Sequence, residues 1–421
     1  MELDLQIKTI KQDNLSFLLN EKEKTASVIQ SYSASGDLII PRCIKHESQE
    51  FIIKEIKSDA FKFSSRIKSI KFSPDTELQT IGKHAFAGST VRSISIPSCV
   101  SELSNGWCDG IQRFTKVTVM ECKTQNLIFY ENKIIIGKSD SKSDQYDIFY
   151  YAQRDIKEIT IPLSLKIISS YAFSSSQIQS ITISPHITKI CECAFACCYN
   201  LRRFEVQENS ELEIIGKHSF AGSEIESFII PSSIVEFNEG WCEGMQFLTK
   251  IKVFKNNDQN ISYYNDEYII GKSDLKSDFF DVIIFARRDL KNSIIPSFIK
   301  KIDSHSFEFT SLESIDIPPQ ITHICDFSFS SCSKLLKIDF DSNSKLQEIG
   351  KHAFSYTSLR SFLIPSNVKH IGDEIFSHCK SLQIIEVSEN INAHLIDKLL
   401  INEDCINIII MIPSSLKFSK D

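Results

Sequence analysis

The segment IPSNVKHIGDEIFSHCKSLQIIEV, residues 364–387, decides the fold of this chain. Its pattern is roughly I-P-x-x-I-x-x-I-x-x-x-A-F-x-x-C/S-x-x-L-x-x-I-x-I, and the closing L-x-x-I-x-I alternates with the period of two that is typical of a strand. Proline follows several such strands directly and ends them, because it has no N–H for a sheet ladder. A unit with one short strand cannot bury its own apolar face, so the pattern predicts stacked copies.

The unit recurs along most of the chain at two periods. IGKHAF at residues 81–86 returns as IGKHSF at 215–220 and as IGKHAF at 349–354, each 134 residues after the last, which indicates duplication of a large block. Within a block, adjacent units are 22 or 25 residues apart. The central aromatic residue of the unit recurs at Phe61, Phe86, Phe173, Phe195, Phe220, Phe307, Phe329, Phe354 and Phe376.

These repeats predict an α/β repeat solenoid built around one long parallel β-sheet. The segment around each Ala-Phe pair is short and flanked by polar residues, so we expect a short helical or 3-10 turn that holds only by packing. Two stretches break the period, near residues 130–152 and 264–286. Each has apolar runs around a centre rich in Ser, Asp and Lys, which is typical of an inserted β-hairpin.

The ends of the chain carry similar patterns. The first and last rungs of a solenoid would otherwise expose core and sheet edge. We therefore predict an N-terminal hairpin cap over residues 1–36, a solenoid over 37–394, and a C-terminal hairpin cap and tail over 395–421.

The repeat unit resembles the BspA-like leucine-rich repeats, and so do the inserts that end in IFYYA and IIFAR. The resemblance covers roughly residues 38–413. Members of that family are found among surface antigens of bacteria and parasitic protists. The resemblance therefore implies a leucine-rich-repeat solenoid, a role in adhesion or host binding, and a place at the cell surface.

Composition and charge limit the classes of partner that we expect. Hydrophobic residues make up 42% of the 421 residues, which is enough for a continuous core, and the net charge of −7 gives no reason to expect nucleic acid. The N-terminus MELDLQIK has neither the basic start nor the apolar run of a secretory signal, and no run approaches a transmembrane length. The sequence itself thus favours a cytoplasmic chain with no membrane segment, whereas the resemblance favours the surface.

Several motifs suggest chemistry but have simpler explanations. Gly137-Lys138-Ser139 and Gly271-Lys272-Ser273 lack the earlier glycine of a phosphate-binding loop, since Asn132 and Asp266 stand there. The cysteines of residues 191–198 lack the paired spacing of a zinc site, and an odd total of 13 argues for reduced cysteines used as small apolar residues. We therefore expect no cofactor and no metal.

Two further residue sets repeat with the blocks. His84, His218 and His352 have identical contexts but fall several rungs apart, so we expect a shared structural role. Trp107 and Trp241 replace the Ala-Phe pair of the normal unit and should therefore lie in the core. No arrangement typical of a catalytic centre is evident, and we predict that the chain is not an enzyme.

A binding surface is expected on the sheet, because residues flanking the second Ile of L-x-x-I-x-I point away from the core. The hairpin tips, residues 140–144 and 274–278, are a further candidate. The function predicted is a non-enzymatic protein-binding scaffold of the surface antigen or adhesin type, with an intracellular assembly scaffold as the alternative. The candidate contact residues on the sheet are Lys71, Lys116, Thr118, Arg203, Glu205, Lys250, Lys252, Lys337 and Asp339.

Overall fold

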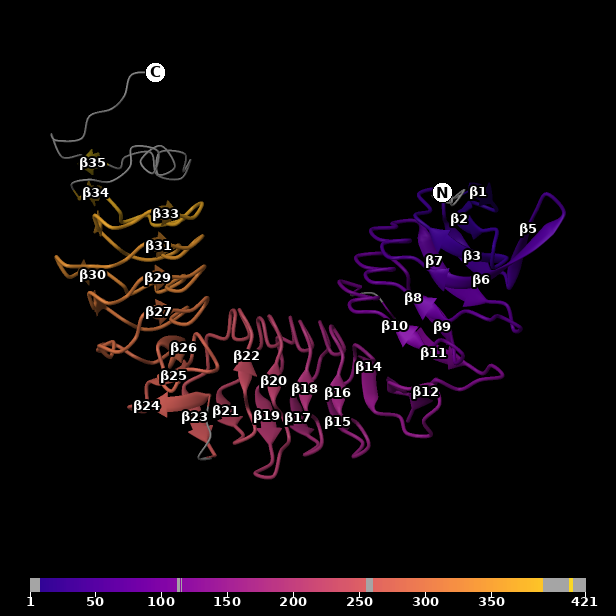
Figure 1. The fold of residues 1–421 in the computed structure, drawn as a ribbon, viewed down its shortest axis with the longest axis horizontal. Helices are drawn as coiled ribbons and strands as arrows, with labels where there is room; N and C mark the ends of the chain where they lie inside the picture. The colour runs from indigo at the N-terminus through magenta and orange to yellow at the C-terminus, as the bar shows by residue number, and fades with distance from the viewer. Residues whose placement is uncertain (1–7, 112–113, 115, 255–259, 389–408, 412–421) are drawn as a thin grey trace, which may run out of the picture. The chain divides into compact units, whose positions relative to one another are not determined.

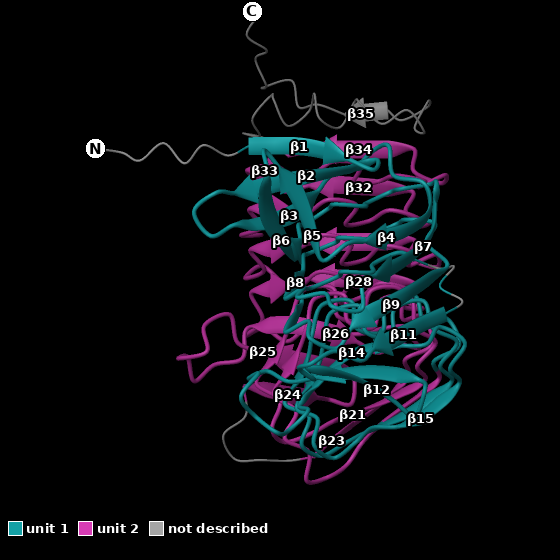
Figure 2. Cartoon of the chain, turned by 90° about the vertical axis from the view of Figure 1, so that its right-hand side faces the viewer, with its two compact units in different colours: residues 1–201 teal, residues 202–421 magenta. Residues whose placement is uncertain are grey.

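The computed structural model of the chain describes residues 8–111, 114, 116–254 and 260–388, together with the backbone of residues 409–411 (Figure 1). All regular structure in these residues is β, and none of it is helical. The expected repeat solenoid is present, but the α/β class with helical or 3-10 turns was wrong, because the fold is a β-solenoid of stacked coils. The chain divides into two compact units, unit 1 with residues 1–201 and unit 2 with residues 202–421, which Figure 2 colours separately.

Most of the predicted L-x-x-I-x-I strands are present and pair in parallel, and we call them the long ladder. The strand expected to start at Leu290 is absent, because residues 287–300 form turns and extended loop. In unit 1 they are β4 (Gly36–Ile40), β7 (Ile67–Phe72), β9 (Ser93–Pro97) and β11 (Lys116–Met120), then β15 (Glu158–Thr160) and β17 (Ser180–Ile183). In unit 2 they are β19 (Arg203–Val206), β21 (Ser227–Ile230) and β23 (Lys250–Val253), then β28 (Ser314–Ile317) and β30 (Lys337–Phe340), then β32 (Ser361–Ile364), β34 (Ile384–Val387) and β35 (Ile409–Met411).

A second ladder of mostly two-residue strands, here the short ladder, runs along another side of each unit. In unit 1 it contains β3 (Thr25–Ile29), β6 (Gln49–Ile56), β8 (Thr80–Ile81) and β10 (Glu102–Leu103), then β14 (Ile148–Ala152), β16 (Ile167–Ile168) and β18 (Lys189–Ile190). In unit 2 it contains β20 (Ile214–Ile215) and β22 (Glu236–Phe237), then β26 (Val282–Ala286), β27 (Lys301–Ile302), β29 (His323–Ile324), β31 (Glu348–Ile349) and β33 (His370–Ile371). Figure 1 shows β27, β29, β31 and β33 stacked one above another. The sequence reasoning missed this ladder.

The Ala-Phe segments form stacked turns instead of helices. Asp59 and Phe63, two residues to either side of Phe61, have φ angles of 59° and 56°, in the left-handed region that an α-helix excludes. The N–H groups of Phe61 and Phe63 then donate to the carbonyl oxygens of Ala85 and Ala87 on the next coil, at 2.7 and 2.8 Å. Hydrogen bonds between coils therefore replace the bonds that a helix would make within the segment.

The repeated IGKH motif has a backbone cause. A Cβ atom on Gly82 would lie 2.6 Å from the N atom of Ser58, and one on Gly350 would lie 2.4 Å from the N atom of Asp326. Only glycine allows this close approach to the preceding coil. The histidine two residues later occupies the left-handed position of the turn in all three copies, with φ angles of 53° at His84, 51° at His218 and 52° at His352.

The core is a column of aromatic rings. The central phenylalanine residues stack from coil to coil, with ring centroids 4.8 Å apart for Phe173 and Phe195 and 4.8 Å apart for Phe307 and Phe329. Trp107 and Trp241 are each 2% exposed, which confirms the prediction that both lie in the core.

Antiparallel strands occur in the inserts and near the N-terminus. The inserts contain β12 (Leu127–Tyr130), β13 (Ile134–Gly137) and β14 in unit 1, and β24 (Ile261–Tyr264), β25 (Tyr268–Gly271) and β26 in unit 2. Near the N-terminus, β1 (Lys8–Gln12), β2 (Leu15–Asn20) and β3 pair in sequence, and β5 (Cys43–His46) pairs with β6. The predicted C-terminal cap, residues 395–421, lies outside the described residues except for the backbone of β35.

Candidate functional site

The predicted contact residues of unit 1 lie on the outward side of the long ladder. Lys71 on β7 and Lys116 on β11 are exposed, and Thr118 is partly exposed. Lys116 lies opposite Ser93 and Thr118 opposite Ser95, so small hydroxyl side chains adjoin the lysine on the neighbouring strand. Figure 2 shows β4, β7, β9 and β11 along one side of unit 1, with β3, β6 and β8 along the other.

In unit 2 the strands β19, β21 and β23 bring three cations together. Arg203 and Lys250 both lie opposite Ser227, on either side of β21, and Lys252 lies opposite Ile229. Adjacent strands are about 4.8 Å apart, so Arg203 and Lys250 stand roughly 10 Å apart with a serine between them. All three cations are exposed, and we call them the basic patch. The fourth predicted residue, Glu205, is also exposed on β19.

The remaining two predicted residues neutralise each other. Lys337 Nζ lies 2.6 Å from Asp339 Oδ2 within β30, and this hydrogen-bonded carboxylate raises the pKa of Lys337. Both side chains are exposed, so the pair contributes little to stability. The nine predicted residues thus lie on β7 and β11, on β19 and β23, and on β30, in three separate sheets.

The inserts interrupt the long ladder, which sequence reasoning did not foresee. In unit 1, β11 ends one sheet and β15 begins another. A groove of about 760 Å³ lies beside the start of β15, lined by Phe114 and Ile156 and by polar residues that include Lys133, Lys157 and Glu158. The groove shows that the predicted continuous sheet face is broken beside the insert.

A buried arginine follows each insert. Arg288, 2% exposed, donates from Nη1 to the carbonyl oxygen of Ser306 at 2.8 Å and from Nη2 to that of His305 at 3.2 Å. Its Nε donates to the carbonyl oxygen of Met245 at 3.2 Å, and its guanidinium lies 4.4 Å from the centre of the Phe285 ring. Arg288 therefore ties the insert to the coils before and after it.

Arg154 is the counterpart of Arg288 in unit 1 and is held less completely. It donates to the carbonyl oxygens of Ala172 at 3.0 Å and Tyr171 at 3.3 Å, and it lines the groove. Its buried Nε has no hydrogen-bond partner among the described residues. The signal in the sequence was that Arg154 and Arg288 stand one block offset apart, whereas their burial is visible only in the structure.

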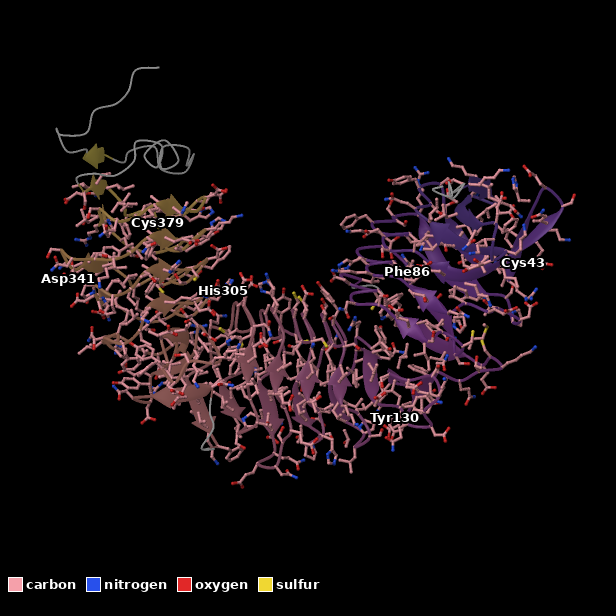
Figure 3. All side chains as sticks on the ribbon, in the orientation of Figure 1. Cys43, Phe86, Tyr130, His305, Asp341 and Cys379 are labelled. Carbon is pink, nitrogen blue, oxygen red and sulfur yellow. The ribbon has the colours of Figure 1, made fainter. Side chains whose placement is uncertain are left out.

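Two histidines at the turns face acidic side chains of different length. His218 Nδ1 lies 2.7 Å from Glu243 Oε2, and the imidazole lowers the pKa of Glu243. In unit 1 the shorter Asp109 stands at the same position, with Oδ2 3.8 Å from His84 Nδ1, and burial raises its pKa. His305, which is labelled in Figure 3, forms a second pair with Glu308. Both side chains are almost fully buried, with Nδ1 3.0 Å from Oε2.

These opposite pKa shifts predict opposite effects on stability. The stabilisation from Glu243 is present above its unfolded pKa near 4.5 and disappears as the pH falls through the lowered folded value. The pKa of Asp109 is higher in the folded chain than in the unfolded chain. The folded state therefore loses stability as the pH rises through the folded value and Asp109 ionises. We expect Glu243→Gln to lower the urea midpoint at pH 7 but not at pH 3, and Asp109→Asn to raise it at pH 7. Each change should stay below about 1 kcal/mol, because these side chains are partly exposed.

The other motifs occupy structural positions. A Cβ on Gly137 would lie 2.6 Å from the Tyr150 ring, and one on Gly271 would lie 2.4 Å from Ile284, so close packing explains both glycines of the GKS motifs. Cys198, Cys332 and Cys379 each donate from Sγ to the carbonyl oxygen of a phenylalanine on the preceding coil, at 3.1, 3.1 and 3.0 Å. Within the described ranges, no group of three or more potential ligands could hold a metal ion.

Comparison with known protein families identifies the repeat unit of the chain. The family model of the BspA type leucine-rich repeat region, in six copies, matches residues 42–138, 142–266 and 281–409. No curated protein matches the chain. Across the part of the chain that the structure describes, no helix is long and apolar enough to span a membrane.

Two solved structures share the fold. A leucine-rich cell surface protein from Faecalibacterium prausnitzii is 18% identical with a TM-score of 0.53, over 97% of this chain and 95% of the other. The pneumococcal vaccine antigen PcpA is 17% identical with a TM-score of 0.51, over 91% of this chain and 82% of the other. At these identities the likeness concerns the fold alone.

Proposed function

We propose, on the premise that this chain belongs to the BspA-type leucine-rich-repeat family, that it is a non-enzymatic scaffold that binds protein partners through the exposed side of its long ladder. The observation that carries the proposal is the basic patch. Arg203 on β19 and Lys250 on β23 lie on either side of Ser227, and Lys252 lies opposite Ile229.

The geometry of the patch favours a macromolecular partner. The parallel strands hold their backbones rigidly, so a partner would meet cations whose spacing is already set, which lowers the entropy cost of binding. Lys252 also lies with Nζ 4.8 Å from the centre of the Phe254 ring, an arrangement that restricts its side chain. A partner that presents acidic side chains would match the patch in charge, and the charge match would mainly speed its association.

The surface-antigen role rests on the two solved structures, one described as a cell surface protein and the other as a vaccine antigen. Biotinylation of intact cells of the source organism, with lysed cells as the control, tests this part of the proposal. Labelling of intact cells supports a surface antigen. Labelling only after lysis would instead favour an intracellular assembly scaffold.

Photo-cross-linking tests the binding surface directly. A benzophenone amino acid replaces Ser227, in the middle of the basic patch, and in a separate chain replaces Glu236 on β22 of the short ladder. Both positions are exposed. We expect adducts with a partner in the source organism from position 227 and few from position 236. Equal adducts from both positions would contradict a site on the long ladder.

Charge reversal of the patch should abolish that adduct. We expect Lys250→Glu with Lys252→Glu, in the chain that carries the cross-linker at position 227, to reduce the adduct by about tenfold or more, because like charges across an interface cost several kcal/mol. The control is Lys301→Glu with Lys300→Glu, which changes the charge equally beside the short ladder. An adduct that survives in the patch variant and is lost in the control would overturn the proposed surface.

A further inference from the structure

Cys99 and Cys122 occupy matching positions on successive coils of unit 1. β9 and β11 are in register up to Pro97 and Met120, and each cysteine follows two residues later. Neighbouring coils are about 4.8 Å apart, which falls within the roughly 4.4–6.8 Å that separates Cα atoms in disulfides. The two thiols lie within hydrogen-bonding reach of each other, and both side chains are partly exposed.

The backbone around the pair is held on both sides. The Ser98 N–H donates to the carbonyl oxygen of Met120 at 2.8 Å, and the Cys122 N–H donates to Ser98 Oγ at 2.8 Å. Ser98 Oγ in turn donates to the carbonyl oxygen of Thr124 at 3.0 Å. The loop after β11 is therefore fixed against the coil that carries Cys99.

The other described cysteines are placed differently. Cys108, Cys198, Cys242, Cys332 and Cys379 are buried, and Cys191, Cys193 and Cys197 lie within seven residues of one coil. Cys43 lies on β5 beside Glu50, and Cys325 follows β29 in unit 2 beside Lys301. Cys193 interacts with Tyr171 and Cys197 with Tyr199. Contact between partly exposed thiols on adjacent coils is therefore established only for Cys99 and Cys122 among the described residues.

We propose that Cys99 and Cys122 are an oxidation site, at which a peroxide converts the two thiols into a disulfide that joins the coil of β9 to the loop between β11 and the first insert. Cys122 attacks hydrogen peroxide, takes up one oxygen as a sulfenic acid and releases water. Cys99 then attacks the Cys122 sulfur, and the S–O bond breaks as the S–S bond forms. The departing hydroxide takes the proton of Cys99 as a second water. Two thiols and one peroxide thus give one disulfide and two waters.

The order of the two steps follows from the surroundings of Cys99. Its Sγ donates to the carbonyl oxygens of Leu78 at 3.4 Å and Thr76 at 3.7 Å. Burial raises the pKa of Cys99 to about 12, so it stays a thiol and is a poor first nucleophile. Cys122 is therefore the residue that meets the oxidant first.

The second block supplies a matched control. Ser233 stands where Cys99 stands in the first block, and its Oγ donates to the carbonyl oxygens of Ser210 at 2.8 Å and Leu212 at 2.7 Å. A serine thus makes the same pair of bonds to the preceding coil. We therefore expect Cys99→Ser to fold like the original chain, while it cannot form the disulfide.

The test is peptide mapping of the full chain after mild treatment with hydrogen peroxide. Free thiols are blocked, the chain is cut with trypsin, and cross-linked peptides are identified by fragmentation. We expect the peptide of residues 93–113 to be joined through Cys99 to Cys122 of the peptide of residues 117–123, with a mass about 2 Da below the sum of the two peptides. This disulfide should form roughly tenfold faster than one between any other pair of cysteines. In Cys99→Ser, Cys122 should instead react with dimedone as a sulfenic acid, and Trp107 fluorescence should match that of the original chain.

Two results would overturn the proposal. One is a Cys122 that proceeds to sulfinic acid in the original chain without any link to Cys99. The other is a link that joins Cys108 or random pairs at the same rate. Neither result depends on a binding partner, so this experiment is independent of the proposed function.

Discussion

Replacement of Arg288 by methionine is expected to destabilise unit 2 by about 3–5 kcal/mol. The buried carbonyl oxygen of Met245 would lose its donor, whereas those of His305 and Ser306 would lose the guanidinium but keep the N–H groups of Glu308 and Ala286. An unsatisfied group costs about 1–3 kcal/mol and each hydrogen bond to a charged group contributes about 1.5–3 kcal/mol, and the gain from no longer burying a charge offsets part of the sum. Urea unfolding followed by Trp241 fluorescence, in a Trp107→Phe background, measures the effect in unit 2.

Two other arginines calibrate the Arg288 result. Arg287→Met removes an ion pair with Asp289, with Nη2 and Oδ2 2.7 Å apart, from a partly exposed site and should cost less than about 1 kcal/mol. Arg154→Met should cost less than Arg288→Met, because the described part of the chain offers Arg154 Nε no hydrogen-bond partner that it could lose. An Arg288→Met chain as stable as Arg287→Met would show that water replaces the lost donor and that the arginine does not hold the insert.

Phe329→Ala should destabilise unit 2 by about 3–5 kcal/mol through a cavity in the aromatic column. The ring stacks between Phe307, with centroids 4.8 Å apart, and Phe354, with centroids 5.5 Å apart. Neighbouring coils are fixed by their backbone hydrogen bonds, so they cannot close the space. The same urea measurement applies, and Phe329→Leu should recover much of the loss.

The control for the cavity is a phenylalanine outside the column. Phe247 is 45% exposed, and we expect Phe247→Ala to change the stability by less than about 0.5 kcal/mol. A Phe329→Ala effect as small as that of Phe247→Ala would mean that the coils collapse onto the cavity. Hydrogen exchange of the N–H groups of Phe307 and Phe329 would then reveal how far the neighbouring turns move.

The candidate site could be predicted only in part. Exposure of Lys71, Lys116, Arg203, Lys250 and Lys252 follows from their alternation with buried residues along single strands. The grouping of Arg203, Lys250 and Lys252 depends on which strands are neighbours and in what register. The ion pair of Lys337 and Asp339 forms within β30, between residues two positions apart on one face of the strand. The break beside β15 depends on how the insert packs, which no local pattern reports.

The sequence alone determined the coil repeat, the positions of the long-ladder strands and the burial of Trp107 and Trp241. These features depend on local alternation and on recurrence at a constant spacing, and both are visible along one chain. The tertiary structure alone decided the left-handed turns at Asp59 and Phe63, the short ladder, the buried Arg154 and Arg288, and the meeting of Cys99 with Cys122. Each of these depends on the backbone groups and side chains that the next coil places alongside, because a stacked coil satisfies its hydrogen bonds with its neighbours rather than within itself.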